Sequence, residues 1–202
     1  MVTFRKWLLA SLLTLIFSGI GLLFWYNELV YSLPTPVPGN YQEVKPGSQV
    51  SLEKYFEAEN GKPVFLHFFN PSCPCSKFNI PHFKSLVKKY GSQATFAIAV
   101  MSKDEYTTAE IQDKFGLNIP VLFDKSLPAS CGVYSTPQAV ILNKNHTLYF
   151  RGNYNKSRYC TDKKTNYAEI AIDALVHNSP EPTFDEAALK AYGCQLPTSC
   201  KK

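Results

Sequence analysis

The sequence predicts a three-layer α/β sandwich with a mixed sheet, preceded by one transmembrane helix. Three observations lead to this fold class. Residues 7–26 form a long apolar run without a charged residue. From residue 63 onward, short apolar runs alternate with stretches of helical periodicity, which favours parallel strands joined by right-handed helical crossovers. Two further apolar runs, 138–142 and 147–151, flank a short polar turn and predict an antiparallel hairpin at one edge of the sheet.

The apolar N-terminal run is long enough to cross a bilayer. As a helix, residues 7–26 would span roughly 30 Å, the thickness of the hydrocarbon core. Arg5 and Lys6 precede the run and the next basic residue is Lys45, so the positive-inside rule predicts a cytoplasmic N-terminus. A cleaved signal peptide is the alternative, but no cleavage site of small residues is visible near Trp25. We therefore expect a retained single-pass anchor in the inner membrane, with the rest of the chain in the periplasm.

Composition divides the chain into four parts. Residues 1–27 are the expected anchor, and the Pro-rich residues 28–39 should form an extended, fairly stiff spacer. Residues 40–178 are expected to fold as one α/β domain, and residues 179–202 form a tail that carries two cysteines. With 202 residues, of which 45% are hydrophobic, the chain is long and apolar enough for one packed domain with these appendages.

The elements of the expected domain follow from local patterns. A buried strand at 63–69 is almost entirely apolar or aromatic. A helix at 76–90 has apolar residues at helical spacing and ends at Gly91. The remaining elements follow in order: a strand at 94–101, a helix at 107–115, a strand at 120–123, a short helix at 126–131, the hairpin, and a helix at 166–177.

Charge and cysteine content narrow the classes of partner. The net charge is +5 and the basic residues are scattered, so no nucleic-acid surface is predicted. The sequence also predicts no cofactor site and no resident metal. The six cysteines indicate an oxidising compartment, where thiols pair or exchange.

Cys73 and Cys75 are the candidate redox-active residues, within the run P-S-C-P-C at 71–75. Cys73 lies between the predicted strand and helix, where unpaired N–H groups and the helix dipole favour a thiolate. We expect Cys73 to be an accessible nucleophile and Cys75 to resolve the mixed disulfides formed at Cys73. The alternatives are a structural disulfide and a pair of metal-binding thiolates. A bridge across one residue would be strained and labile, which disfavours a structural role.

Three motifs carry a resemblance to a known family. Residues 69–75 (FNPSCPC) resemble F-W-A-x-W-C-x-x-C, residues 79–83 (NIPHF) resemble E-M-P-x-L, and residues 132–137 (GVYSTP) resemble G-V-x-G-T-P. In these motifs, within residues 63–154, the chain resembles the thioredoxin-like superfamily, in particular its membrane-anchored TlpA/ResA-like branch. The resemblance implies a thioredoxin-like fold and thiol–disulfide oxidoreductase activity, with protein thiols and disulfides as substrates and an upstream redox partner.

The resemblance also implies roles for Thr136 and Pro137. In the family, the proline of this loop is cis, the loop faces the active disulfide, and it pairs with the backbone of the substrate. Without the resemblance we would expect a trans bond, since only a small minority of X–Pro bonds in folded proteins are cis. We therefore predict Thr136 and Pro137 as site residues, with an ordinary trans turn as the alternative.

The chain departs from the family at the second cysteine. The first cysteine of the family matches Cys73, but the second falls on Ser76. The resolving thiol is therefore either Cys75 or a cysteine from elsewhere in the chain, and we predict Cys75. The reductase or oxidase direction stays open, because it depends on the reduction potential rather than on the motif.

His67 lies in the predicted strand, six residues before Cys73. Many members of the superfamily carry a buried acid at this position, which moves protons for the second cysteine. A buried histidine can do the same near neutral pH, so His67 is a candidate site residue. The alternative is a core histidine whose ring nitrogens are satisfied by neighbouring groups.

The other four cysteines are Cys131, Cys160, Cys194 and Cys200. We expect them to form two structural bridges, with Cys194 and Cys200 able to close a small loop in the tail. A relay that passes oxidation from Cys73 and Cys75 to a pair in the tail is the sharper hypothesis. Spacing does not decide the pairing, since six cysteines allow 15 arrangements.

Other functions are compatible with this fold or with these thiolates. A peroxiredoxin would need a proline and a threonine where this chain has Leu66 and Asn70, so peroxidase activity is disfavoured. A copper chaperone of the Sco-like type would use Cys73 and Cys75 as Cu(I) ligands. His82 lies about two helical turns beyond Cys75, roughly 10 Å, which is too far for it to join them. Copper binding is the non-enzymatic alternative, and a redox-inactive binding domain is the third.

Overall fold

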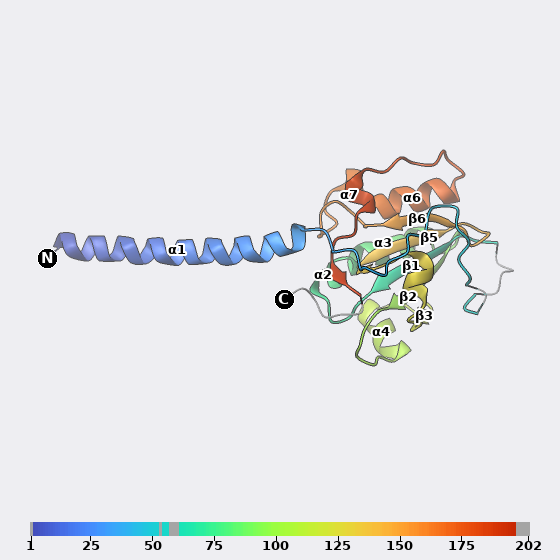
Figure 1. Ribbon diagram of the computed structural model, residues 1–202, viewed down its shortest axis with the longest axis horizontal. Coiled ribbons are helices and arrows are strands. Elements are labelled where there is room, and N and C mark those ends of the chain that lie inside the picture. The colour runs from blue at the N-terminus through green and yellow to red at the C-terminus, as the bar shows by residue number, and fades with distance from the viewer. Residues whose placement is uncertain (1, 53, 57–60, 197–202) are drawn as a thin grey trace. The chain divides into compact units, whose positions relative to one another are not determined.

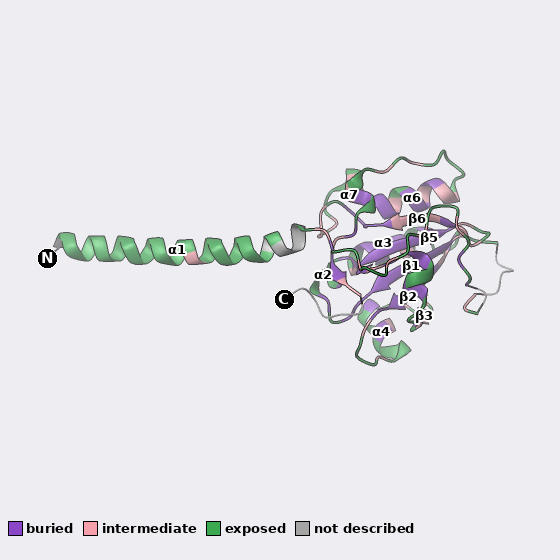
Figure 2. Ribbon diagram, viewed as in Figure 1, coloured by how far each residue is buried: buried purple, intermediate pink, exposed green. Residues whose placement is uncertain are grey.

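The computed structural model describes residues 2–52, 54–56 and 61–196. The chain divides into two compact units, Met1–Pro34 and Thr35–Lys202. The first unit is a single helix, α1 (Val2–Ser32), drawn in blue in Figure 1. Its residues Thr3–Asn27 are long and apolar enough to cross a membrane, and no other helix in the described ranges is. Their side chains are almost all exposed, as Figure 2 shows, which fits the expected membrane-spanning segment.

The second unit is built on a five-stranded mixed sheet in the order β3-β2-β1-β5-β6. Its strands are β1 (Val64–Phe69), β2 (Thr95–Val100), β3 (Val121–Leu122), β5 (Gln138–Leu142) and β6 (Leu148–Gly152). β1 pairs in parallel with β2, and β2 with β3. β5 pairs antiparallel with both β1 and β6. The parallel half and the antiparallel hairpin are those that the sequence predicts.

Helices cover both faces of this sheet (Figure 1). On one face pack α3 (Ile80–Tyr90), α4 (Thr108–Phe115) and α6 (Tyr167–Val176), and on the other packs α5 (Leu127–Cys131). Side chains alternate along β1. Phe65 and Phe69 lie in the core that includes α3, α4 and α6, whereas Leu66 and Phe68 lie in the core that includes α5. The central strands β1, β2 and β5 are buried on both faces, as Figure 2 shows. The predicted three-layer α/β/α sandwich with a mixed sheet is therefore confirmed.

The helix predicted over 76–90 is two helices in the structure. α2 (Pro74–Phe78) ends at Asn79, and α3 begins at Ile80. Pro81 explains the break, because it lacks the N–H that would bond the carbonyl of Lys77 in a continuous helix. The N–H of Asn79 donates to that carbonyl instead. Asn79 is thus the one residue between the two helices.

The first and last described segments of the second unit pack against its body. α7 (Glu186–Leu189) contacts β6, and β7 (Cys194–Gln195) pairs antiparallel with β4 (Ser135–Thr136) outside the main sheet. Thr35 is buried, and its N–H donates to the carbonyl of Ala191 at 2.8 Å. The folded unit therefore begins within the expected spacer and includes most of the expected tail.

Candidate functional site

The turn after β1 carries the predicted nucleophile. Cys73 directly precedes α2 in an extended backbone conformation, and its N–H donates to the carbonyl of Asn70 at 3.1 Å. The Asn70 side chain accepts from the Ser72 N–H at 2.9 Å, and the Asn70 N–H donates to Ser76 Oγ at 3.2 Å. Pro74 takes the first position of α2, where a missing N–H leaves no helical bond unmade. These contacts hold one defined turn around Cys73.

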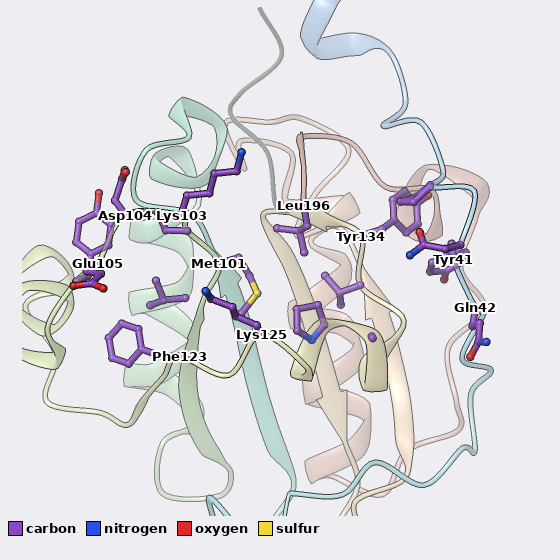
Figure 3. A pocket seen from close by; sticks show the side chains of 18 residues that line it. Tyr41, Gln42, Met101, Lys103, Asp104, Glu105, Phe123, Lys125, Tyr134 and Leu196 are labelled. Carbon is purple, nitrogen blue, oxygen red and sulfur yellow. Dashed lines mark hydrogen bonds between the residues drawn. The ribbon is translucent and has the colours of Figure 1, made fainter.

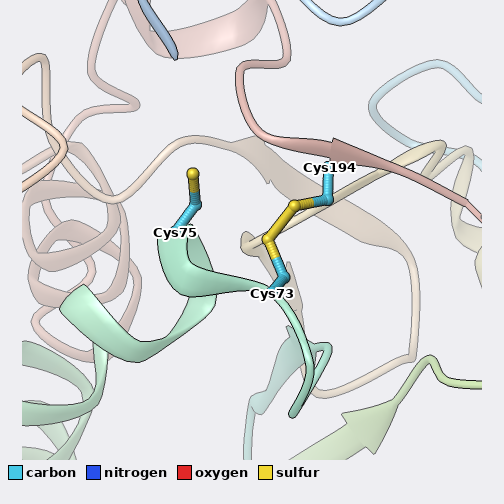
Figure 4. Close-up of side chains that lie close together, drawn as sticks. All are labelled: Cys73, Cys75 and Cys194. Atoms are coloured by element: carbon cyan, nitrogen blue, oxygen red, sulfur yellow. A yellow bond between two sulfur atoms is a disulfide. The ribbon is translucent and has the colours of Figure 1, made fainter. Parts of the chain in front are cut away.

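Three cysteine sulfurs meet at this turn (Figure 4). Cys73 forms a disulfide with Cys194, with Cα atoms 6.5 Å apart and a sequence separation of 121. The Sγ atom of Cys75 and the two bonded sulfurs all lie within 4.8 Å of one another. Thiol–disulfide exchange proceeds by attack of a thiolate on a bonded sulfur, so the third sulfur is placed for exchange. The structure thus places Cys73, Cys75 and Cys194 together.

The disulfide is shielded from solvent. Cys73 has 0% of its surface exposed, Cys194 1% and Cys75 6%. The expectation of an accessible Cys73 is therefore wrong for this disulfide-bonded form, because β7 brings Cys194 onto the turn. The expectation that Cys194 closes a loop within the tail is also wrong, since Cys194 is bonded to Cys73. Cys200 lies outside the described residues.

The peptide bond between Thr136 and Pro137 is cis, as the resemblance implies. Thr136 and the residue before it, Ser135, form β4 and are fully buried. In the pairing of β4 with β7, Thr136 lies opposite Cys194. The backbone edge that the resemblance assigns to a substrate is therefore paired with the chain's own C-terminal strand.

His67 lies within β1 and is fully buried. Its Nδ1 is 2.6 Å from the hydroxyl of Tyr154, and its ring stacks on Phe83 and meets Phe115 edge-on. Its Nε2 has no hydrogen-bond partner. Burial lowers the pKa of His67 to about 3, so the ring is neutral at physiological pH. These contacts are those of a core residue.

Cys131 and Cys160 are free thiols that belong to different cores. Cys131 is fully buried at the end of α5, and burial raises its pKa to about 12. The thiol of Cys160 donates to Asn79 Oδ1 at 2.7 Å, and burial raises its pKa to about 12 as well. The Asn79 amide donates in turn to the carbonyl of Cys75 at 3.4 Å. The expectation of structural bridges at Cys131 and Cys160 is therefore wrong: both are free thiols, Cys131 buried in one core and Cys160 packed against the other.

A groove of about 960 Å³ lies beside the turn (Figure 3). The loop after β2 forms one wall, and Tyr41 and Tyr134 lie on the other. Asp104, in that loop, accepts from Ser72 Oγ at 3.0 Å and so connects the groove to the turn that carries the disulfide. Leu196, the residue after β7, also lines the groove. The sequence did not predict this groove.

Sequence reasoning missed both β7 and the role of Cys194. β7 is two residues long, which is too short to show strand alternation. The pairing of six cysteines cannot be read from their spacing. A glycine directly before Cys194 is the one local sign of a close backbone approach.

Comparisons with known proteins agree with this architecture. The profile of a family described as "Domain of unknown function (DUF6436)" matches residues 42–197. A curated relative, the thiol-disulfide oxidoreductase ResA of Halalkalibacterium halodurans, is 27% identical over 149 residues, which are 70% of this chain and 82% of that protein.

Two solved structures share the fold with a TM-score of 0.63 each. One is a hypothetical protein from Sinorhizobium meliloti 1021, 15% identical, with coverage of 78% of this chain and 96% of that one. The other is an uncharacterized conserved protein from Geobacillus kaustophilus, 17% identical, with coverage of 80% and 97%. Together with the sheet order, the comparisons confirm the thioredoxin-like fold that the three motifs imply.

Proposed function

We propose that this protein, which belongs to the family described as a domain of unknown function (DUF6436), is a thiol–disulfide oxidoreductase that exchanges disulfides with other proteins through Cys73. The observation that carries the proposal is the sulfur cluster. Cys73 is bonded to Cys194, with Cys75 in reach of both, and the strand that bears Cys194 pairs with the residues before a cis proline. The relative ResA is named for the same activity.

Four of the five predicted site residues have a place in the proposed reaction. Cys73 forms the mixed disulfide with the partner, and Cys75 resolves it. Thr136 and Pro137 supply the backbone edge on which the partner lies. For His67 we propose the core role, because its ring is neutral and packed among aromatic side chains. Protein thiols and disulfides are the substrates, and an upstream redox partner restores Cys73 and Cys75 after each turnover.

We further propose that α1 anchors the chain in the inner membrane, with the folded unit in the periplasm. The length and hydropathy of Thr3–Asn27 support the anchor, and Arg5 and Lys6 ahead of the apolar residues support the orientation. Membranes washed with carbonate should retain the full chain, and protease added to spheroplasts should digest the folded unit. Release by carbonate would contradict the anchor, and protection from protease would contradict the orientation.

The exchange activity can be tested with the full chain in detergent micelles. Equilibration in glutathione redox buffers should show a two-electron transition, and the reduced chain should reduce insulin disulfides. Cys73→Ser should abolish insulin reduction, whereas Cys131→Ala, which alters a thiol in a separate core, should keep it. Insulin reduction that survives in Cys73→Ser would contradict the proposal.

A second candidate function is Cu(I) binding by the same cysteines. The observation that favours it is the three-sulfur set within 4.8 Å, which on reduction offers one more soft ligand than the sequence predicted. Titration of the reduced chain with Cu(I) against a competing chelator measures the affinity, and Cys194→Ser should lower it sharply. A stable Cu(I) complex in a chain that does not exchange thiols would favour the copper function over the oxidoreductase.

A further inference from the structure

Residues 191–196, which we name the Cys194 segment, lie against β4 and Cys73. The segment runs antiparallel to β4, with Cys194 opposite Thr136, and the Leu196 N–H donates to the carbonyl of Tyr134 at 3.1 Å. Its cysteine is bonded to the proposed nucleophile. The segment therefore makes, within one chain, the two contacts that a partner polypeptide would make: a paired backbone edge and a disulfide.

The Cys194 segment also indicates what the groove accepts. Successive side chains of an extended strand point to opposite sides, so residues two apart share a side. Cys194 points to Cys73, and Leu196, two residues on, lines the groove beside the turn (Figures 3 and 4). A polypeptide that fits this surface therefore has a cysteine followed, two residues later, by an apolar side chain.

Beyond the pairing with β4, Thr35 makes two hydrogen bonds to the segment. The Thr35 N–H donates to the carbonyl of Ala191 at 2.8 Å, and the Thr35 hydroxyl donates to the carbonyl of Gly193 at 3.1 Å. Gly193 has a φ of 140°, and a Cβ at this position would collide with the carbonyl oxygen of Thr136. A methyl group at Gly193 would therefore displace the segment from β4.

We propose that the Cys194 segment is an internal substitute for the partner, and that a protein with an extended Cys-x-apolar sequence replaces it during exchange. The inference rests on the proposed oxidoreductase function and adds to it the class of partner and a closed form. In the closed form Cys73 is bonded to Cys194 and sealed from solvent thiols. In the open form the segment leaves β4 and the groove, and the partner occupies both.

Cys75 supplies the step between the two forms. Its thiolate attacks Cys73 Sγ, so that a Cys73–Cys75 bond forms and the Cys73–Cys194 bond breaks. Cys194 leaves as a thiolate and takes up the proton that Cys75 has lost, so no electron enters or leaves the chain.

A partner with two thiols then completes the reaction. One partner thiolate attacks Cys73 Sγ, Cys75 leaves, and a mixed disulfide results. The second partner thiolate attacks the partner sulfur of that bond, and Cys73 leaves. The partner thereby gains a disulfide, and Cys73 and Cys75 are reduced by the two electrons it has lost; the reverse sequence reduces a partner disulfide.

The test follows the oxidised full chain, in detergent micelles, as it reacts with a synthetic peptide of the sequence of residues 191–196. Gly193→Ala should form the peptide–Cys73 mixed disulfide about tenfold faster than the wild type, since the added methyl opens the segment and all cysteines remain. Gly39→Ala, where a Cβ meets no atom within 4 Å, is the control and should react within about twofold of the wild type. Mass spectrometry after acid quenching gives the rates.

A second variant and a second peptide complete the test. Thr35→Val removes the hydroxyl contacts with the Gly193 carbonyl and with Ser135 Oγ of β4, changes no residue of the Cys194 segment, and should also speed the reaction. A peptide with aspartate in place of the leucine should react several-fold more slowly with both variants. Folding of each variant is checked by thermal melting.

The outcomes separate the two proposals. Wild-type rates in folded Gly193→Ala and Thr35→Val would overturn the closed form, and equal rates for the two peptides would overturn the preference of the groove. If no peptide thiol reacts with Cys73 in any variant, the oxidoreductase function itself fails.

Discussion

His67 is packed among aromatic rings on the central strand, and burial lowers its pKa to about 3 in the folded protein. In an unfolded chain a histidine titrates near pH 6.5. Between about pH 3 and 6.5 the unfolded state therefore binds a proton that the folded state does not. The contribution of neutral His67 to stability is fully present above about pH 6.5 and is lost as the pH falls through this window.

We predict that acidification from pH 7.5 to 4.5 removes roughly 2–3 kcal/mol of the free energy of unfolding through His67 alone. His67→Phe keeps an aromatic ring in the layer and should lose this part of the pH dependence. Urea unfolding at the two pH values measures it. His146→Asn, in the hairpin turn at a positive φ that asparagine tolerates, is the control and should behave as the wild type. An unchanged pH dependence in His67→Phe would contradict the prediction.

The thiols of Cys131 and Cys160 should be unreactive in the folded protein. Burial raises the pKa of Cys131 and of Cys160 to about 12, so at pH 8 neither holds an appreciable fraction of thiolate. With iodoacetamide at pH 8, both should be alkylated at least about a hundredfold more slowly in the native chain than in urea. Peptide mass mapping measures each site, and rapid native labelling of Cys160 would show that its contact with Asn79 does not protect it.

At the scale of the element, α4 begins directly after the loop that forms one wall of the groove. Thr107 caps this helix in a capping box: its Oγ1 accepts from the Glu110 N–H at 3.2 Å, and its own N–H donates to Glu110 Oε2 at 2.7 Å. Gly116 ends the helix with a φ of 60°, in the left-handed region that favours glycine. Both ends of α4 are therefore defined by local contacts.

Thr107→Ala should lower the free energy of unfolding by about 1 kcal/mol, because it removes the side-chain oxygen that satisfies the Glu110 N–H. Thr108→Ala, one residue on, is the matched control and should change stability by less than about 0.5 kcal/mol. Urea unfolding of the two variants at neutral pH measures both. Equal losses would mean that the cap does not stabilise α4.

At the scale of the whole molecule, Thr35, the first residue of the folded unit, makes hydrogen bonds to the residues just before β7. Thr35 bonds to Ala191 and Gly193, and its hydroxyl lies 2.9 Å from Ser135 Oγ in β4. A chain cut at the boundary that composition suggests, residue 40, would lose all three contacts. Thr35 and the Cys194 segment therefore stabilise each other.

A protein that begins at Asn40 should melt about 5 °C lower than one that begins at Thr35, since two or three hydrogen bonds contribute roughly 1–3 kcal/mol. Its Cys73–Cys194 disulfide should also be reduced sooner by dithiothreitol. A third protein beginning at Leu33 is the control and should match the one that begins at Thr35. Calorimetry and timed thiol counts distinguish the three, and identical melting would show that Thr35 does not stabilise the fold.

Local patterns predicted most of the fold. The run at 63–69 is β1, the periodic stretch before Gly91 contains α3, and the two apolar runs at 138–151 are β5 and β6. Each of these elements is predicted by the spacing of apolar residues that are close in sequence. The break at Asn79 was missed because a proline two residues on also fits the first turn of a helix.

By itself, the sequence determined the apolar N-terminal helix, the order of strands and helices, and the turn that carries Cys73 and Cys75. Only the tertiary structure decided which sulfur Cys73 is bonded to and whether solvent reaches it. Cys194 lies 121 residues away, and the bond depends on the close approach of Gly193 to β4 and on Thr35 behind it. Such long-range pairing is set by the packing of the whole unit, which no local spacing encodes.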